Sequence, residues 1–526
     1  MNTKYFIPFL LLTLLFITGC QKLNEIPKSE LTAVSFFKSQ SDLDGAVAAC
    51  YECYAHDYSY GFTSRMFNCF GSDDLAGPHG SDKYSARSFD ELNGDPNSSE
   101  VLNDWKAFYT GIYQANNVIV NYKKVASTDD LKNGSAAQAY FLRAWAYYML
   151  VRSFGPVPLL PGASDADTRA ARADASAVYA SIVSDLQTAI SLFPATFQIS
   201  AGRANQWSSK TLLADVYLTM TGWPLNDASK YDSAAATANE VIQSGAFTLV
   251  PDYATVFTSN NSSESIWDIE FNKSDGTAQR GYGLDAIPLE EVGQDGSSGW
   301  DDYFPEISFY KDAPKCKRSD ETFYTAIKFQ NTDRKTYHLV PWYSNSTVEW
   351  HPYYKKFRYG VGVPGNGDGC QETDSSIISM NASTNKSNDI MRYPMVLLDY
   401  AEASAMATGA PTTSGYNAIN LVRSRAGLPD LTPGLSAAQF RDSVVSERAY
   451  EFAGENGIRW FDIVRLQLLP QIIAARDTTK SGDYYWASRE NPIPSKYIAD
   501  PSHAYLAPIP SSEMQLNPGW KQNPGY

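Results

Sequence analysis

One stretch of the sequence, residues 135–154, limits the folds open to this chain more than any other. Its apolar residues form two stripes at helical spacing, which predicts a helix that is apolar on almost all sides. Such a helix must be covered by neighbouring elements on several sides. Gly155 and Pro156 follow directly, as expected where a helix ends. We therefore expect this helix to lie inside a mainly helical fold.

Further helices are expected on both sides of this stretch, and they fall into pairs. Paired helices with small residues at the crossings are typical of tetratricopeptide-like units, whose period is about 34 residues. Two segments fit this pattern well, 210–218 followed by 231–242 and 398–403 followed by 417–421. We therefore predict a mainly α fold with a frame of tetratricopeptide-like helical pairs. The expected helices are 101–124, 176–193, 208–221, 228–244, 392–408, 416–426 and 436–453.

The composition changes between about residues 250 and 389, where helical stripes become rare. This part is rich in Gly, Asn, Ser and Tyr, which favours long loops and short strands. We expect it to be a loop-rich, aromatic-rich insert in the helical frame, where functional residues often lie. The predicted organisation is a signal peptide at 1–19, a helical part at 20–249, the insert at 250–389 and a second helical part with a C-terminal tail at 390–526.

The first residues have the features of a secretion signal. Residues 6–17 are apolar but too few to span a bilayer, which takes about 20 residues. Lys4 precedes them and Thr18, Gly19 and Cys20 follow, as in a bacterial lipoprotein signal. Cleavage before Cys20 would leave that residue to carry acyl chains, which anchor a protein stably. We expect a soluble domain tethered to a membrane through Cys20.

Charge and aromatic content narrow the choice of ligand. The formal net charge of −15 opposes binding to a phosphate backbone, so nucleic acid is not an expected partner. Aromatic residues make up 13% of the chain, including 34 Tyr and 11 Trp. Their rings offer flat apolar faces with a polar edge. A ring-shaped ligand is favoured.

The remaining cysteines and the histidines predict no metal site, and we expect no cofactor. Five cysteines remain besides Cys20, an odd number that cannot form a complete disulfide framework. Cys50 and Cys53 are spaced as C-x-x-C, but they lie in an expected helix without a second ligand pair. Oxygen-bearing residues in 93–104 begin like a calcium loop, yet Ser98 replaces the required Gly. A polar turn that caps the next helix is the preferred interpretation.

Catalysis is not expected either. Carboxylates are adjacent at 73–74, 290–291 and 301–302, but glycoside hydrolysis needs two carboxyl groups about 5 to 9.5 Å apart across the bond. No nucleophile elbow, P-loop or dinucleotide fingerprint is present in the sequence. A surface hydrolase stays an alternative that release of products from polymers would reveal.

Charged residues near the C-terminus alternate in sign, as in paired ions. Arginine side chains match carboxylates bidentately, so we expect a semi-buried ion network that locks helices together. The final residues, 522–526, are expected to dock on the frame as a turn and tail. The predicted network consists of Glu447, Arg448, Glu451, Arg459, Asp462 and Arg465.

Motifs in a fixed order along the whole chain resemble the SusD/RagB family of outer-membrane nutrient-binding lipoproteins. One difference is visible at 455–459, which is one residue longer than the compact form of the motif and affects the helix register before Arg459. After the signal, the motifs are DWKAFYTGIYQANNVI at 104–119, AYFLRAWAYYMLVRSFGPVPL at 139–159, NLVRSRAGL at 420–428, ERAYEF at 447–452 with RWFDIVR at 459–465, and YLAPIPSSEMQLNPGWKQNPGY at 505–526.

The resemblance implies a SusD-like fold and a binding function on the outer face of the outer membrane. Members of this family cover a TonB-dependent, SusC-like β-barrel transporter and deliver oligosaccharides to it, or peptides in some relatives. From another class, the alternative is a lipid-tethered scaffold whose repeats bind only protein. The aromatic-rich insert favours the first, because a scaffold has no need of Trp and Tyr gathered in loops.

Candidate ligand residues come from the insert and from the loop before the helix at 101–124. Aromatic faces stack on the C–H faces of pyranose rings while nearby polar groups bind hydroxyls. The alternative is that the Trp residues hold loops that lack a core of their own. The candidates are Trp300, Tyr303, Trp342, Tyr343 and Trp350 with Asp301 and Asp302 in the insert, and Asp73 and Asp74 in the loop.

Overall fold

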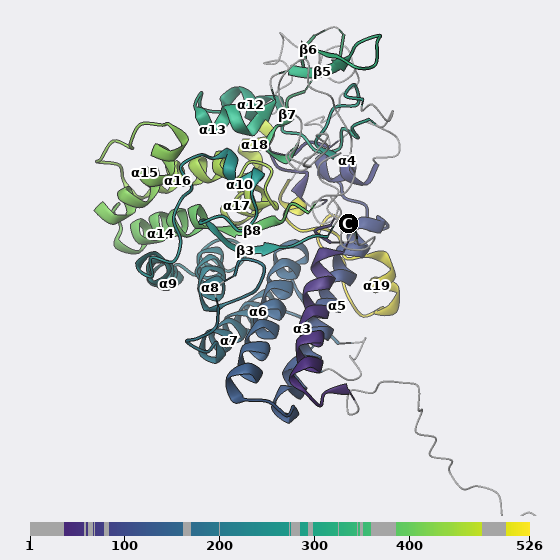
Figure 1. Cartoon of the computed structure of the whole chain (residues 1–526), viewed down its shortest axis with the longest axis vertical. Helices are drawn as coiled ribbons and strands as arrows, with labels where there is room; N and C mark the ends of the chain where they lie inside the picture. Colours follow the sequence, from purple (N-terminus) through teal and green to yellow (C-terminus); the bar gives the residue numbers. More distant parts are fainter. Residues whose placement is uncertain are drawn as a thin grey trace, which may run out of the picture.

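Helices build the frame of the molecule, as predicted, and the strands among the described residues are short (Figure 1). The computed structural model describes residues 36–56, 59–61, 67, 69–77, 84–160, 162, 170–198, 200–272, 274, 285–292, 298–324, 326–344, 346–347, 351–358, 385–475 and 501–526. The longer helices are α3 (Gln40–Ala55), α5 (Ser99–Asn121), α6 (Asp129–Phe154), α7 (Ala175–Leu192), α8 (Gln206–Met220), α9 (Lys230–Gln243), α14 (Tyr393–Thr408), α15 (Thr413–Ala426), α16 (Ala437–Glu451) and α17 (Ile458–Leu466).

Helix α6 is the central helix that the sequence predicts. Its side chains are buried around most of its circumference because α3, α5, α7 and α8 pack against it. It begins at Asp129, six residues before the predicted stretch, because the Thr128 side chain accepts a hydrogen bond from the backbone of Leu131 and caps the helix. It ends before Gly155, which has a φ of +71°. A Cβ atom there would lie 2.8 Å from Cδ1 of Leu506, so a larger residue would also force that side chain to move.

The expected helical pairs are present, and they close into one frame. Helix α8 packs against α9, and α14 packs against α15, as predicted. Helix α14 also packs against α9 and α16, so the N-terminal and C-terminal helices share one core. Figure 1 shows this arrangement, with α14–α16 beside α8 and α9. The capping prediction is also confirmed, because Ser98 caps α5 through the backbone of Val101.

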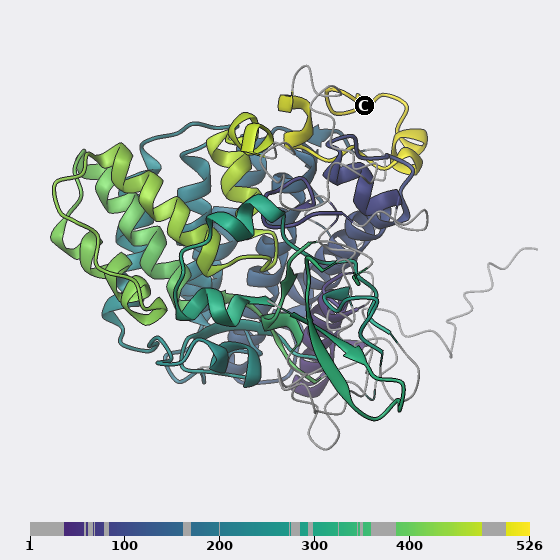
Figure 2. The same cartoon turned by 90° about the horizontal axis from the view of Figure 1, so that it is seen from above.

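The insert leaves the frame at a two-stranded antiparallel sheet. Strand β3 (Ser265–Ile269) pairs with β8 (Asn388–Arg392), which brings the two ends of the insert together. Beyond this pair a hairpin, β5 (Ala326–Gln330) and β6 (Tyr337–Pro341), extends from the body of the molecule (Figure 2). Strands β4 (Phe323–Tyr324) and β7 (Tyr353–Tyr354) form another short pair. The insert also contains the short helices α10 (Ala254–Thr258), α12 (Ile307–Asp312) and α13 (Lys317–Thr322), which the prediction of loops and strands omits.

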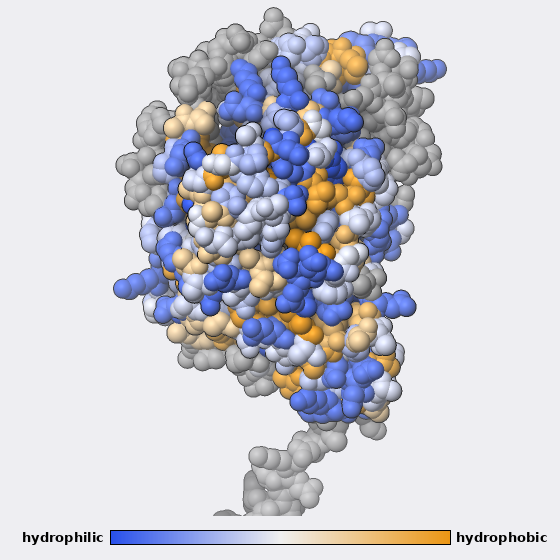
Figure 3. Space-filling model, turned by 90° about the vertical axis from the view of Figure 1, so that its left-hand side faces the viewer, coloured by the Kyte–Doolittle hydropathy of each residue, from blue (hydrophilic) through white to orange (hydrophobic). Residues whose placement is uncertain are grey.

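The remaining described elements are short. No helix in the described residues is long and apolar enough to cross a membrane. The side of the frame that carries α15 is mostly polar, with apolar residues in patches (Figure 3). The remaining short elements are α4 (Tyr84–Asp90), η4 (Tyr122–Lys124), β1 (Val157–Pro158), β2 (Arg172–Ala173), η5 (Lys356–Arg358), α18 (Leu469–Ala475), η8 (Pro501–Tyr505) and α19 (Ser511–Leu516).

Candidate functional site

Two of the predicted ligand residues are buried, Tyr303 in the main core and Trp342 in a small separate cluster of the insert. Tyr303 is 2% exposed, and its ring lies 5.3 Å from that of Phe357. Its hydroxyl donates to the backbone oxygen of Gly454, which ties the insert to the helical frame. Trp342 is also 2% exposed and packs edge-on against Tyr310, with ring centroids 5.7 Å apart. Both residues therefore support the loops from within, the alternative that the sequence left open.

Asp301 and Asp302 are buried as well. The carboxylate of Asp301 lies 3.2 Å from Nε2 of His351, and the His351 ring stacks on Phe304 with centroids 3.5 Å apart. Asp301 has a φ of +57°, a conformation that Asp tolerates better than most residues. The backbone N–H of Asp302 donates to the carbonyl of Asp285 at 2.8 Å. Both aspartates therefore help to fix the course of the chain just after Trp300.

Among the predicted aromatic residues that the structure describes, Trp300 and Tyr343 reach the surface. Trp300 is 37% exposed and Tyr343 is 44% exposed. Each is followed or preceded in the chain by a buried residue, Asp301 after Trp300 and Trp342 before Tyr343. Leu289 and Leu339 are also exposed in the insert. We name the set Leu289, Trp300, Leu339 and Tyr343 the candidate ligand face.

Hydrogen bonds connect the segment that carries Trp300 to the β5–β6 hairpin. Gly299 donates its backbone N–H to the carbonyl of Glu291 at 3.2 Å. The Glu291 carboxylate accepts from the backbone of Lys328 in β5 at 2.9 Å. One residue further on, the carbonyl of Val292 accepts from the Tyr337 hydroxyl in β6 at 3.0 Å. The exposed side chains of this region therefore stand on a braced backbone, which favours binding because little order has to be gained.

Asp73 joins the loop before α5 to the insert and to the frame. Its carboxylate makes a bidentate ion pair with Arg459, at 2.7 and 2.8 Å, and its carbonyl accepts from the backbone of Glu306 at 3.2 Å. It borders a hollow of about 280 Å³ in which Phe309 and Tyr450 stack with ring centroids 4.8 Å apart. The two regions that the sequence predicted to supply ligand contacts therefore meet in the structure.

Asp74 is fully buried and holds the same junction. Its carboxylate accepts from the backbone of Gly454 at 2.7 Å and from the Ser72 hydroxyl at 2.5 Å. Its carbonyl accepts from the hydroxyl of Tyr354 in β7. Burial, together with the nearby charge of Asp73, raises the pKa of Asp74 to about 6. Asp74 is thus placed to hold backbone segments together and not to meet a ligand at the surface.

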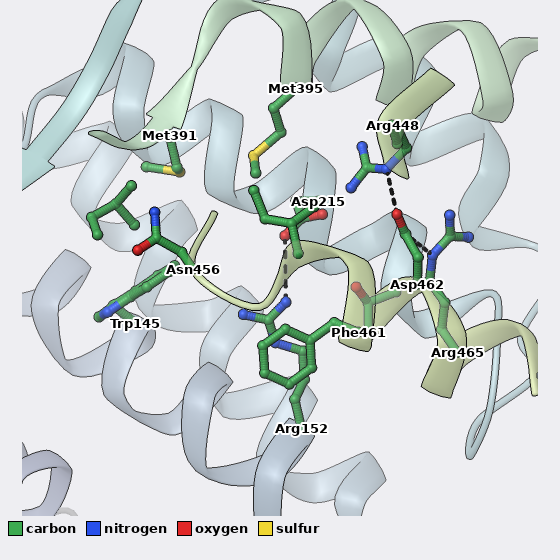
Figure 4. A pocket seen from close by; sticks show the side chains of 13 residues that line it. Trp145, Arg152, Asp215, Met391, Met395, Arg448, Asn456, Phe461, Asp462 and Arg465 are labelled. Carbon is green, nitrogen blue, oxygen red and sulfur yellow. Dashed lines mark hydrogen bonds and ion pairs between the residues drawn. The ribbon is translucent and has the colours of Figure 1, made fainter. Parts of the chain in front are cut away.

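All six residues of the predicted ion network form ion pairs, but they fall into separate sets with further partners and lie deeper than expected. Arg448 of α16 pairs with Asp399 and, at 2.8 Å, with Asp462 of α17. Arg465 pairs with Asp462 at 2.8 Å and with Glu402 at 2.6 Å. Figure 4 shows Arg448, Asp462 and Arg465 beside an internal cavity of about 20 Å³, which has room for about one water molecule. The cavity is structural in character because ion pairs already engage its charged groups.

A second set of buried ions lies around Glu451. Its carboxylate contacts Arg425 at 2.5 Å, Arg392 at 2.6 Å and Arg318 at 3.0 Å. Burial would raise the pKa of Glu451, but the three guanidinium groups outweigh it and lower the pKa to about 2. The extra residue in 455–459 is absorbed by left-handed conformations at Asn456 and Gly457, just before α17. The other ion pairs of this set are Arg318–Glu447, Arg423–Glu447, Arg392–Glu264, Arg425–Glu264, Arg392–Glu455 and Lys356–Glu455.

The C-terminal tail docks on the frame, as predicted. The Asn523 side chain donates to the carbonyls of Phe154 and Ala507 at 3.0 and 2.7 Å. It also accepts from Arg172 at 2.6 Å. The tail therefore closes the end of α6 and has a structural role.

Other predicted positions fall partly outside the described residues. Cys20, Trp350 and Cys370 lie outside the described residues, and what the sequence predicts for them stays a prediction. Cys50, Cys53 and Cys316 are free thiols in the structure. Among the described residues no group of three His, Cys, Asp or Glu side chains is arranged to hold a metal ion. Sequence reasoning missed His351 and Phe304, because two residues 47 positions apart give no signal that their rings stack.

Known protein families and relatives match this chain over most of its length. Residues 263–526 match the family described as the SusD family, and residues 23–218 match one described as starch-binding associating with outer membrane. SusD-like protein P2 of Formosa agariphila is 28% identical, with 99% of this chain and 100% of the relative covered.

Solved structures show the same fold. A SusD homolog from Bacteroides thetaiotaomicron superposes with a TM-score of 0.80 at 24% identity, covering 94% of this chain and 98% of that one. Surface glycan-binding protein A from Bacteroides thetaiotaomicron, solved in complex with laminarihexaose, gives a TM-score of 0.69 at 22% identity, covering 92% and 100%.

Proposed function

This chain belongs to the SusD family, and from that membership we propose that it binds oligosaccharides at the cell surface and delivers them to a SusC-like, TonB-dependent transporter. The proposed role is binding without catalysis. The structural neighbour that holds laminarihexaose supports carbohydrate as the ligand class. The family described as starch-binding associating with outer membrane supports the proposed location, with Cys20 as the lipid anchor.

The observation that carries this proposal is the candidate ligand face. Trp300 and Tyr343 offer exposed ring surfaces in the insert, while Tyr303 and Trp342 are buried. Indole and phenol rings stack on the C–H faces of sugars, and the Tyr343 hydroxyl can bind sugar hydroxyls. The hydrogen bonds from Glu291 and Val292 to the hairpin hold this segment in place. Oligosaccharides are therefore the ligand class that the face suits best, with peptides as the second choice.

The ligand test separates binding from folding. The wild-type protein is screened on an array of plant, algal and bacterial glycans and peptides, and the ligand found is titrated calorimetrically into Trp300→Ala and Tyr343→Ala. We expect each variant to lose affinity by about 1 to 3 kcal/mol, the value of an aromatic stack on a flat ring by analogy with nucleic-acid bases, with an unchanged melting temperature. Leu421→Ala is the matched control, because Leu421 is a large apolar residue that is also exposed, on α15 and outside the insert.

Two results would contradict this assignment. If both variants bind as tightly as the wild type, the ligand face lies elsewhere. If neither glycans nor peptides bind the wild type, the transport role itself is wrong, and the protein-only scaffold becomes the better explanation.

The partner is tested separately. Gentle detergent extraction from the native membrane followed by affinity purification should recover a SusC-like β-barrel with this protein. Repeated recovery of this protein alone would count against the pairing.

A further inference from the structure

A second pocket lies on another part of the molecule, between α5 and the C-terminal helix α19. Its volume is about 370 Å³, within the usual range for small-molecule sites. Figures 1 and 2 both place α19 apart from the β5–β6 hairpin, so this pocket is separate from the candidate ligand face. Its floor consists of Trp105, Ile112, Pro158, Leu160 and Trp520.

Aromatic rings pack against one another in the floor and beside it, and two polar groups there already have partners. The Trp105 ring lies 5.0 Å from Tyr109 and 6.2 Å from Trp520, measured between centroids. The Tyr109 hydroxyl donates to the carbonyl of Pro158 at 3.0 Å, and Nε1 of Trp520 donates to the carbonyl of Ala170 at 3.2 Å. What remains for a ligand is a set of apolar ring and aliphatic surfaces held in fixed positions.

The mouth of the pocket adds exposed side chains and two charged groups. Tyr113 on α5 and Leu516 on α19 are both exposed at its edge. Lys106 and Glu513 line it with a donor and an acceptor of opposite charge. Burial raises the pKa of the half-buried Glu513 and the charge of Lys106 opposes this, so the two groups act on each other across the mouth.

A pyranose ring fits this combination better than a purely apolar group does. Its C–H face can cover the aromatic floor while its hydroxyls replace the water around Lys106 and Glu513. A purely apolar side chain would displace that water without replacing its hydrogen bonds, which is costly. We propose that the pocket between α5 and α19 is a second saccharide-binding site, independent of the candidate ligand face and suited to a neutral glycan. It shares its ligand class with the proposed function but uses different residues.

Two variants change the pocket in different ways. Tyr113→Ala deletes an exposed ring at the mouth, and Thr110→Trp places a bulky side chain at an exposed position of α5 that lines it. Val120→Ala is the matched control, because Val120 is as exposed as Tyr113 on the same helix but does not line the pocket. Melting temperatures verify that all three variants are folded.

The experiment uses calorimetric titration with laminarihexaose, maltohexaose and xylohexaose in two backgrounds, the wild type and the double variant Trp300→Ala/Tyr343→Ala. We expect at least one hexaose to bind the double variant. Adding Tyr113→Ala should weaken that binding by about tenfold or more, as the loss of one aromatic stack does. Adding Thr110→Trp should abolish it, and adding Val120→Ala should leave it unchanged.

The outcomes distinguish the two sites. If the double variant has lost all binding while the pocket variants bind normally in the wild-type background, the second site is wrong and the candidate ligand face stands. If only the pocket variants lose binding, the second site stands and the candidate ligand face is wrong. If no hexaose binds the double variant but an apolar tripeptide does, and Thr110→Trp prevents it, the pocket accepts a protein segment and the saccharide proposal is overturned.

Discussion

Replacing Glu451 with Gln tests whether the buried ion network stabilises the fold. Glu451 is fully buried and contacts three guanidinium groups, those of Arg318, Arg392 and Arg425. Its pKa is about 2 in the folded chain against an ordinary value of 4.5. At about 1.36 kcal/mol per pH unit, that difference corresponds to about 3 kcal/mol of folding free energy. Removing one member of a buried ion set costs about 3 to 5 kcal/mol, which agrees.

The sign of the pH dependence follows from the lowered pKa. A carboxyl group with a depressed folded pKa contributes its full stabilisation above 4.5 and loses it as the pH falls toward about 2. We therefore expect Glu451→Gln to lower the free energy of unfolding by about 3 kcal/mol at pH 7. The difference from the wild type should shrink steadily below pH 4.5, because a protonated glutamate resembles glutamine.

Urea unfolding followed by circular dichroism and tryptophan fluorescence at pH 7, 4 and 3 measures this difference. Glu240→Gln is the control, because its carboxylate pairs with Lys210 at 2.6 Å but is 57% exposed. Such a pair contributes about 0 to 1 kcal/mol. If Glu451→Gln changes stability no more than the control does, or if its effect is the same at pH 7 and pH 3, the reasoning is refuted.

Other predictions concern the anchor, the junction and the tail. Cys20→Ala should release the protein from membranes, and recovery of the variant in a salt-washed membrane pellet would exclude the lipid anchor. The raised pKa of Asp74, about 6 against 3.8, means that its contribution is present below pH 3.8 and is lost as the pH rises through 6. Urea unfolding should therefore find Asp74→Asn more stable relative to the wild type at pH 7 than at pH 4, and an equal difference at both would contradict this. Asn523→Ala should lower the free energy of unfolding by about 1 to 3 kcal/mol because buried carbonyls lose their donor, with glycan binding by calorimetry unchanged.

The sequence determined the local elements of this protein. The helix at α6, its stop at Gly155 and the cap at Ser98 follow from periodicity and from side chains within a few residues, so they could be predicted. The charge pattern of 447–465 also predicted ion pairs, because arginines and carboxylates that alternate along packed helices must be paired when they are buried.

Only the tertiary structure decided which residues meet and which reach the surface. The sequence could not distinguish Trp300, which is exposed, from Trp342, which is buried, because both occur in similar loop-rich segments. Nor could it predict that Asp73 pairs with Arg459, 386 residues away. The pocket between α5 and α19 exists because the C-terminal tail returns to a helix near the start of the chain. Contacts between residues far apart in sequence depend on how whole elements pack, and local periodicity carries no information about that packing.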